Sequence, residues 1–361
     1  MNIATSIVIG KQVSADLAKT AVSNAMAKAK LNIANSVLLL LSSEFAGNPL
    51  PAIKAAAKAA NCTQVMGCSA SGIFTEDDWV VDAPAVAAMV LGGDVSLSLP
   101  PLHESELPLL TLSAPNAINT TWLNHHIRYG GVSGDATGRG PFSVWQNAKG
   151  NVTGHIEAHV TGTKIATGVS HGLKLLTEAH KVMQSDQFDI LLLGNHNPIK
   201  LLDKAWKTHQ KQKAAIPLHL IMAVYADSIE AIRNGNFHQT PVISCNDDSA
   251  SVTLAQKIPE GKFLCWAIRD VNVAQNDMRN TIHTLENTLN AKPDFGLLFS
   301  CMGRGPYFYE GLDLDLAAIK KALPDMPLLG FYGNGEIARI GNNNQLLPYS
   351  AVLSLFSTHK I

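Results

Sequence analysis

The sequence predicts an α/β protein whose layered mixed sheets are built from duplicated β-α-β-α-β units. Two short turns rich in glycine, Gly67–Gly72 and Gly330–Glu336, lie in the first and the last quarter of the chain. Each turn follows a helix-like run and a short apolar strand, and one more apolar strand comes after it. Strands that alternate with helices of this length are typical of layered α/β sheets.

In the first copy, short apolar runs indicate strands, and longer runs with helical spacing of apolar residues indicate helices. These elements are the strand Thr5–Ile9, the helix Ala15–Lys30, the strand Val37–Leu41, the helix Ala52–Ala60, the strand Gln64–Met66 and, after the turn, the strand Ala85–Leu91.

The second copy repeats this order near the C-terminus. Its elements are the strand Phe263–Ile268, the helix Asn276–Leu289, the strand Gly296–Ser300, the helix Leu314–Leu323, the strand Leu328–Leu329 and, after the turn, the strand Ala351–Phe356. Because the two copies share few identical residues, the predicted duplication rests on the element order and on the type of turn.

The middle of the chain is less regular. It contains a predicted helix at Ala117–Arg128, a third Gly-rich turn at Gly130–Asp135 and a hairpin that joins Phe142–Gln146 to Val152–Thr161. A chain of 361 residues corresponds to two domains. We place their boundary where a polar helix end meets a proline, which gives domains over residues 1–214 and 215–361.

Composition excludes several classes of function. The net charge is −1 and no basic stripe is present, so nucleic-acid binding is not expected. No apolar run approaches the roughly 18 residues of a membrane span, and we expect a cytoplasmic protein. Charged residues make up only 16% of the chain, which leaves a homo-oligomer open. The five cysteines fit no zinc or disulfide pattern, so no metal site is expected from them.

The first turn offers backbone N–H groups and hydroxyl groups to a ligand. Ser69 and Ser71 supply the hydroxyls, and Gly72 leaves the backbone uncovered. Cys68 can act as a nucleophile only if a base lies beside it. The alternative interpretation is a tight turn with an inert core cysteine.

The second turn and the strand before it carry opposite charges. Arg304 stands between two glycines after a buried strand, and Glu336 directly follows Gly335. A guanidinium can fork onto a carboxylate and a carboxylate can accept from an ammonium, which together suit an amino acid. A solvated loop arginine and a capping carboxylate are the alternative interpretations.

Histidines give a weaker signal. His155, Glu157 and His159 alternate along a predicted strand, where a metal site and a polar outer face are both open. No Walker loop and no catalytic triad is present. The residues alone therefore indicate an α/β protein that either binds a ligand or is an enzyme.

Several of these segments together resemble the FIST family of sensory proteins, as an N-terminal FIST domain over 1–214 and a C-terminal FIST domain over 215–361. The segments that carry the resemblance are Gly67–Gly72, Gly130–Asp135, Val169–Gly172, Leu298–Gly305 and Leu328–Glu336. The family often has a glutamate where this chain has Ile73, so we expect the C-terminal copy to provide charge recognition.

The resemblance implies a sensory module that binds a small polar ligand such as an amino acid and acts through a separate signalling partner, such as a kinase or a cyclase. No catalytic residue is expected. The residues expected to line the ligand site are Cys68, Ser69, Ser71, Gly72, Gly131, Asp135, Cys301, Arg304, Asn334 and Glu336.

Two alternatives stay open. Some members of the family resemble haem proteins that sense nitric oxide, and His171 and His196 would be the first candidates for haem ligands here. The other alternative is an enzyme with Cys68 or Cys301 as its nucleophile.

Overall fold

The computed structural model describes residues 2–100, 107–118, 123, 126–135, 137–150, 154–209 and 215–358. The chain forms two compact units. The first unit contains Met1–His171 and Asp277–Ile361, and the second unit contains Gly172–Asn276. The boundary that we predict near residue 214 concerns the family domains and stays a prediction.

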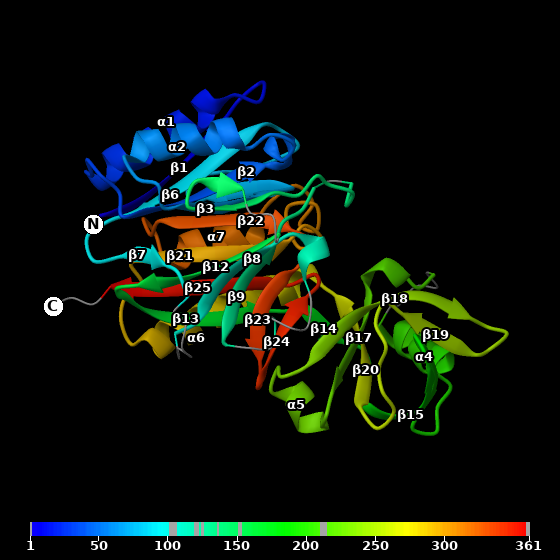
Figure 1. The fold of residues 1–361 in the computed structure, drawn as a ribbon. Coiled ribbons are helices and arrows are strands. Elements are labelled where there is room, and N and C mark those ends of the chain that lie inside the picture. Colours follow the sequence, from blue (N-terminus) through cyan, green and yellow to red (C-terminus); the bar gives the residue numbers. More distant parts are fainter. Residues whose placement is uncertain are drawn as a thin grey trace. The chain divides into compact units, whose positions relative to one another are not determined.

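The predicted α/β class is confirmed, and the first copy has the expected helices and strands in the expected order, with two further strands at Gly72–Thr75 and Trp79–Val81 that were not predicted (Figure 1). Its elements are β1 (Ile3–Ile9), α1 (Ala15–Ala29), β2 (Ser36–Ser42), a short 3₁₀ turn at Ser43–Phe45, α2 (Leu50–Ala60), β3 (Val65–Ala70), β4 (Gly72–Thr75), β5 (Trp79–Val81) and β6 (Ala85–Leu91). Gly67–Gly72 is thus mostly strand, and only Ser71 separates β3 from β4.

The C-terminal copy repeats this arrangement. Its elements are β13 (Thr163–Ser170), α6 (Val271–Leu289), β21 (Phe295–Cys301), α7 (Leu314–Ala322), β22 (Leu328–Gly333), β23 (Glu336–Ile340), β24 (Asn343–Leu347) and β25 (Ala351–Thr358). One expectation is wrong: the strand predicted at Phe263–Ile268 lies in the second unit, and β13 takes its place beside β25. After β13 the chain leaves this copy and forms the second unit over Gly172–Asn276. It returns to the copy within α6.

The middle segment is a third copy, which the sequence reading missed. Its strands are β7 (Ser96–Ser98), β8 (Leu109–Ser113), β9 (Arg128–Val132), β10 (Val144–Gln146), β11 (Lys149–Gly150) and β12 (His155–Thr161), with a 3₁₀ turn at Pro115–Ala117. The predicted hairpin between β10 and β12 is wrong, because β12 pairs with β8 and β7. Arg128 begins β9 rather than ending a helix, and residues 119–122, 124 and 125 of that predicted helix lie outside the described residues.

Among the described residues of the first unit, three six-stranded sheets share one topology. Their orders are β1-β6-β2-β3-β10-β11, β7-β12-β8-β9-β23-β24 and β13-β25-β21-β22-β4-β5. In each sheet the third and fourth strands are parallel, and the last two form a hairpin. That hairpin always comes from another copy, so the three copies exchange hairpins in a cycle.

Each parallel pair contains a glycine for a steric reason. A Cβ on any of these glycines would overlap the carbonyl oxygen of the residue opposite it, far inside the contact distance of two atoms. The pairs and the resulting distances are Gly67 with Leu39 at 1.7 Å, Gly130 with Thr111 at 1.8 Å and Gly330 with Leu298 at 2.1 Å.

Apolar residues from all three sheets form one central core. Alternate residues of the three equivalent strands β2, β8 and β21 point into it, as the two-residue period of a strand requires. These residues are Leu38, Leu40, Leu110, Leu112, Leu297 and Phe299. The opposite face of the β1-β6-β2-β3 part is covered by α1 and α2, and that of the β25-β21-β22 part by α6 and α7 (Figure 1).

The second unit is a small antiparallel barrel. Its elements are β14 (Leu173–Leu175), β15 (His180–Asp186), β16 (Asp189–Leu193), α4 (Pro198–His209), a 3₁₀ turn at Leu218–Leu220, β17 (Ile221–Ala226), α5 (Ile229–Arg233), β18 (His238–Asn246), β19 (Ser251–Leu254) and β20 (Phe263–Arg269). The barrel closes because β20 pairs with both β15 and β17. Its interior is filled by side chains such as Leu264, Trp266 and Ile268.

No helix within the described part of the chain has both the length and the apolar character that crossing a membrane would require.

The glycine in the first parallel pair gives a stability prediction. Gly67→Ala should lower the free energy of unfolding by about 3 kcal/mol, because the added methyl group meets backbone that cannot move aside. Gly47→Ala is the control, since the nearest atom to its Cβ is 3.9 Å away. Urea unfolding of the two variants measures the difference. Equal stability of both would contradict the account of the parallel pairs.

Candidate functional site

The strand ends of the three copies meet at one place in the first unit. Counted from the glycine of each parallel pair, Ser71, Gly134 and Asn334 occupy the same position, four residues further along the chain. The Ser71 N–H donates to the Tyr332 carbonyl at 3.1 Å, and the Asn334 N–H donates to the Val132 carbonyl at 2.9 Å. Backbone pairing between copies therefore brings these three junctions together.

The Gly134 backbone lies close to side chains of the other two junctions. A Cβ at Gly134 would lie 2.8 Å from the Ser71 hydroxyl oxygen and 3.2 Å from the Asn334 Oδ1 atom. The two side chains thus approach the Gly134 backbone from different copies, and only glycine leaves them that space. We call Ser71, Gly134, Asp135, Asn334 and Glu336 the junction site.

Ser69 supports the junction site rather than facing it. Its Oγ accepts from the Ser143 N–H at 3.0 Å and lies 3.2 Å from the Ser133 Oγ. The Ser133 hydroxyl donates to the Ser69 carbonyl at 2.5 Å. These bonds tie the ends of β3 and β9 to the segment that leads into β10.

Asp135 is held by one of its two carboxylate oxygens. The Oδ2 atom accepts from the Thr137 hydroxyl at 2.6 Å and from the Gly140 N–H at 3.1 Å. The Oδ1 atom is buried and has no hydrogen-bond partner. The Asp135 side chain is therefore held through its Oδ2 atom, while its Oδ1 atom accepts no hydrogen bond.

Glu336 is completely buried at the start of β23, opposite Gly131 of β9. Gly131 has to be a glycine, since its Cβ would lie 2.7 Å from the Phe331 ring. Neither Glu336 oxygen makes a hydrogen bond of ordinary geometry. Burial raises the pKa of Glu336 well above its usual value, and the Ser350 backbone and the Arg304 charge oppose that rise.

Three side chains of the junction site thus carry buried oxygens without partners: Ser71 Oγ, Asp135 Oδ1 and both oxygens of Glu336. Buried polar atoms in folded proteins nearly always have partners, and an orphan costs about 1–3 kcal/mol. Each of these groups needs a hydrogen-bond partner that the described part of the protein does not supply.

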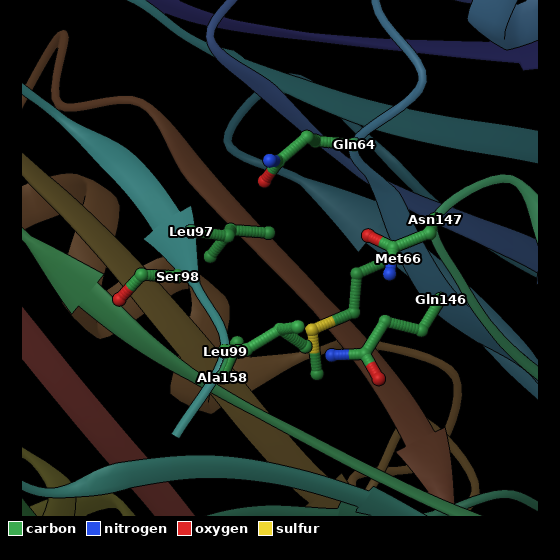
Figure 2. A pocket seen from close by; sticks show the side chains of 8 residues that line it. All are labelled: Gln64, Met66, Leu97, Ser98, Leu99, Gln146, Asn147 and Ala158. Carbon is green, nitrogen blue, oxygen red and sulfur yellow. The ribbon is translucent and has the colours of Figure 1, made fainter. Parts of the chain in front are cut away.

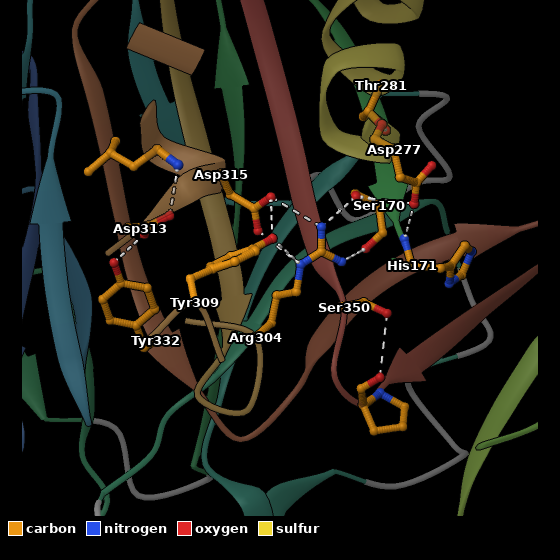
Figure 3. Close-up of polar contacts among 12 residues, drawn as sticks. Ser170, His171, Asp277, Thr281, Arg304, Tyr309, Asp313, Asp315, Tyr332 and Ser350 are labelled. Carbon is orange, nitrogen blue, oxygen red and sulfur yellow. Dashed lines mark hydrogen bonds and ion pairs between the residues drawn. The ribbon is translucent and has the colours of Figure 1, made fainter. Parts of the chain in front are cut away.

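Arg304 has an internal partner. Its Nε and Nη2 atoms lie 3.0 and 3.1 Å from the two Asp315 oxygens, and Tyr309 donates its hydroxyl to the same carboxylate at 2.9 Å (Figure 3). Arg304 also donates to the Ser170 carbonyl at 2.9 Å and to its hydroxyl at 2.7 Å. Arg304 is 2% exposed, and the two N–H groups that could bind a ligand carboxylate bind Asp315 of the protein itself.

A second buried acid lies beside this network. Asp313 caps α7 by accepting a hydrogen bond from the Leu316 N–H at 2.8 Å. Its other carboxylate oxygen accepts a hydrogen bond from the Tyr332 hydroxyl. Burial raises the pKa of Asp313 to about 6, and the charge of Asp315 adds to the rise. The start of α7 therefore carries two buried carboxyl groups, of which Asp315 binds Arg304.

The remaining site candidates from the sequence have other surroundings. Cys68 is completely buried in the central core, where burial raises the pKa of its thiol, and Cys301 is 8% exposed at the end of β21. Gly72 pairs with Tyr332 in the ladder between β4 and β22.

The histidine candidates divide between the two units. Glu157 forms an ion pair with Arg128 at 2.6 Å, and the His159 Nδ1 lies 3.2 Å from the Pro108 carbonyl. The described residues contain no cluster of metal ligands. The His171 N–H donates to Asp277 at 2.7 Å in the first unit, whereas His196 contacts the ring of His180 in the second.

A small pocket in the first unit offers a different environment (Figure 2). Side chains from β3, β7, β10 and β12 line it together with residues that flank these strands, and none of them is charged. They are Gln64, Met66, Leu97, Ser98, Leu99, Gln146, Asn147 and Ala158. Gln146 already donates to the Glu157 carbonyl at 2.7 Å, so its amide N–H is engaged within the protein.

The fold defines a class, an α/β protein built from several mixed sheets and helices. Residues 200–339 match the family model of the FIST C domain, which is a sensory domain family. The match includes Ser300–Gly305 and Gly330–Glu336, two of the motifs that carry the resemblance. A sensory role is consistent with this match, and the N-terminal FIST domain stays a prediction.

Similar curated proteins are known from bacteria and animals. The chain is 22% identical over 324 residues to an uncharacterized protein of Mycobacterium tuberculosis. The matched region covers 81% of this chain and 83% of the relative. It is 25% identical over 229 residues to an uncharacterized protein of Mycobacterium bovis, with coverage of 63% and 59%. F-box only protein 22 of Homo sapiens is 32% identical over 102 residues, or 27% of this chain and 22% of the relative.

The Arg304–Asp315 pair gives a second prediction. Asp315→Ala should lower the free energy of unfolding by about 3–5 kcal/mol, because it leaves a buried guanidinium without a counter-charge. The double variant Arg304→Met with Asp315→Leu should recover most of that loss. Thermal and urea unfolding measure both. If the double variant loses as much free energy of unfolding as Arg304→Met and Asp315→Leu lose together as single variants, the charges do not act as a pair.

Glu336 gives a prediction about pH. Its pKa is raised in the folded state, so the unfolded chain loses this proton first as pH rises from 4.5, and stability falls. Glu336→Gln should remove this fall. The free energy of unfolding of the variant, relative to that of the unaltered protein, should therefore increase from pH 5 to pH 8. Denaturant unfolding across this range tests it, with the exposed Glu310→Gln as the control. A constant difference between the two proteins would mean that Glu336 is ionised in the fold.

Proposed function

We propose that the chain is a sensory protein that binds a small polar molecule, an amino acid or a similar compound, at the junction site. It acts through a separate signalling partner, such as a kinase or a cyclase, in the cytoplasm and catalyses no reaction itself. Residues 1–214 serve as the N-terminal FIST domain of this sensor. The observation that carries the proposal is the set of buried, unpartnered oxygens on Ser71, Asp135 and Glu336.

The position of the junction site supports a signalling role. Each junction connects a strand of one copy to a hairpin, or to the segment before a hairpin, that completes the sheet of another copy. A ligand bound there contacts the connections among all three copies. If it binds one arrangement of the hairpins more tightly than another, it shifts the population between them, and a partner can read that shift.

The two alternatives have no comparable support. A haem held by His171 and His196 needs both side chains free, and His196 packs against His180. A nucleophilic Cys68 needs a thiolate, and the raised pKa of its buried thiol works against one.

Ligand-dependent stabilisation tests the proposal. Full-length protein should unfold at a higher temperature with a ligand from a panel of amino acids and small amines, since a ligand at 100 times its Kd adds about 2.7 kcal/mol. Ser71→Ala should reduce the shift and should not weaken the fold, because this hydroxyl has no partner to lose. Asp325→Asn, an exposed acid outside the junction site, is the control. Absence of stabilisation by every compound in the panel would overturn the proposal.

A further inference from the structure

The central core of the first unit contains a cavity between its three sheets, which we call the core cavity. Its walls come from β2, β8 and β21, the equivalent strands of the three copies, together with β22. Two sets of three side chains line it. The residues directly before the partners of the parallel-pair glycines are Leu38, Leu110 and Leu297, and those directly after them are Leu40, Leu112 and Phe299.

The repeat of these strands explains why side chains do not fill the core cavity. Three side chains that point towards one centre from equivalent strands meet at their tips, and none can cross the centre without overlapping the other two. Protein interiors are otherwise close-packed, with few spaces of molecular size. The core cavity has room for about one water-sized molecule.

The side chains around the core cavity are apolar and buried. All six are between 1% and 4% exposed and consist of hydrocarbon alone. The backbone N–H and C=O groups of β2, β8 and β21 point along the sheets, where each strand pairs with a neighbour on both sides. A buried water needs about two to four polar partners, which these walls do not provide. The core cavity therefore favours an apolar guest over water.

We infer that the core cavity binds a small apolar molecule no larger than a xenon atom, such as dioxygen. The transfer of an apolar molecule from water into apolar surroundings is favourable. The side chains around the cavity also gain dispersion contacts that they lack towards its centre. Dry apolar cavities in proteins bind xenon for these reasons.

Such a guest contacts all three copies at once, because each copy contributes one strand to the walls. A ligand that binds only the folded state stabilises that state, so the guest strengthens the packing of the three copies against one another. The core cavity shares no residue with the junction site, and its guest does not depend on the ligand proposed there.

Xenon and dioxygen test the inference on the full-length protein by NMR spectroscopy of labelled leucine methyl groups. Rising xenon pressure should shift the methyl resonances of Leu38, Leu110 and Leu297 progressively towards saturation. Dioxygen, which is paramagnetic, should speed the relaxation of the same methyl groups. Leu202 is the control, because it is completely buried in the second unit and does not line the cavity.

A filled cavity separates this site from xenon bound elsewhere. The C-terminal copy has Phe299 where the other two have leucine, so Leu112→Phe places a second ring at the equivalent position. This variant should abolish the xenon response of the remaining lining leucines. Leu40→Phe makes the same change in the first copy and takes its place if Leu112→Phe does not fold. Leu112→Met nearly conserves the side-chain volume and should keep the response.

The response of the lining leucines decides the outcome. Shifts or faster relaxation that are confined to them and lost in Leu112→Phe support the site. The absence of a response to either gas, or a response equal to that of Leu202, would overturn the inference. Nuclear Overhauser effects from water to these methyl groups would also overturn it, because the cavity would then hold water. A response that persists in Leu112→Phe would place the guest elsewhere and contradict the inference as well.

Discussion

The first unit depends on the antiparallel pairing through which its three copies exchange hairpins. Because β4, β10 and β23 each complete the sheet of another copy, no copy can finish its own sheet alone. The glycines of the parallel pairs make the exchange possible. Gly67 pairs with Trp145 of the arriving hairpin and Gly330 pairs with Phe74, and both aromatic side chains are completely buried. The missing Cβ provides the space for these rings, so one steric constraint defines the strand order and brings the junctions together.

The buried ion pair holds the C-terminal copy in position beside the junction site. Replacing such a pair by apolar residues often costs no stability, so its effect lies in the geometry that it enforces. Arg304 binds Asp315 at the start of α7 and Ser170 at the end of β13. The Met302 N–H, just before it, donates to the Gly333 carbonyl at 2.8 Å, directly before Asn334. The loop that carries Met302 and Arg304 therefore contacts α7, β13 and the backbone directly before Asn334.

Much of the fold could be predicted because its buried strands are continuous apolar runs of the right length. β6 was predicted with its observed bounds, and β2 and β21 were placed within one or two residues. The middle copy was not predicted because Gly130 and Gly131 are typical of a turn by local rules, whereas pairing with β8 makes them strand. In the candidate site, the glycine-rich segments predicted as turns run into strands, and Gly67–Gly72 is mostly strand. The partner of Arg304 could not be predicted, because its approach depends on how α7 packs.

The three sheets share one strand order but differ in chemistry at one equivalent position of the exchanged segments. Opposite the residue that follows each parallel-pair glycine, the exchanged segments place Val144, Ile73 and Glu336. The first two are apolar and can be buried without loss, whereas a buried carboxyl group without partners costs several kcal/mol. Sites where a sequence departs from what its fold favours tend to be functional. Glu336 lies within the segment that matches the FIST C domain, so this departure from an otherwise apolar set falls in the part of the chain that the family model covers.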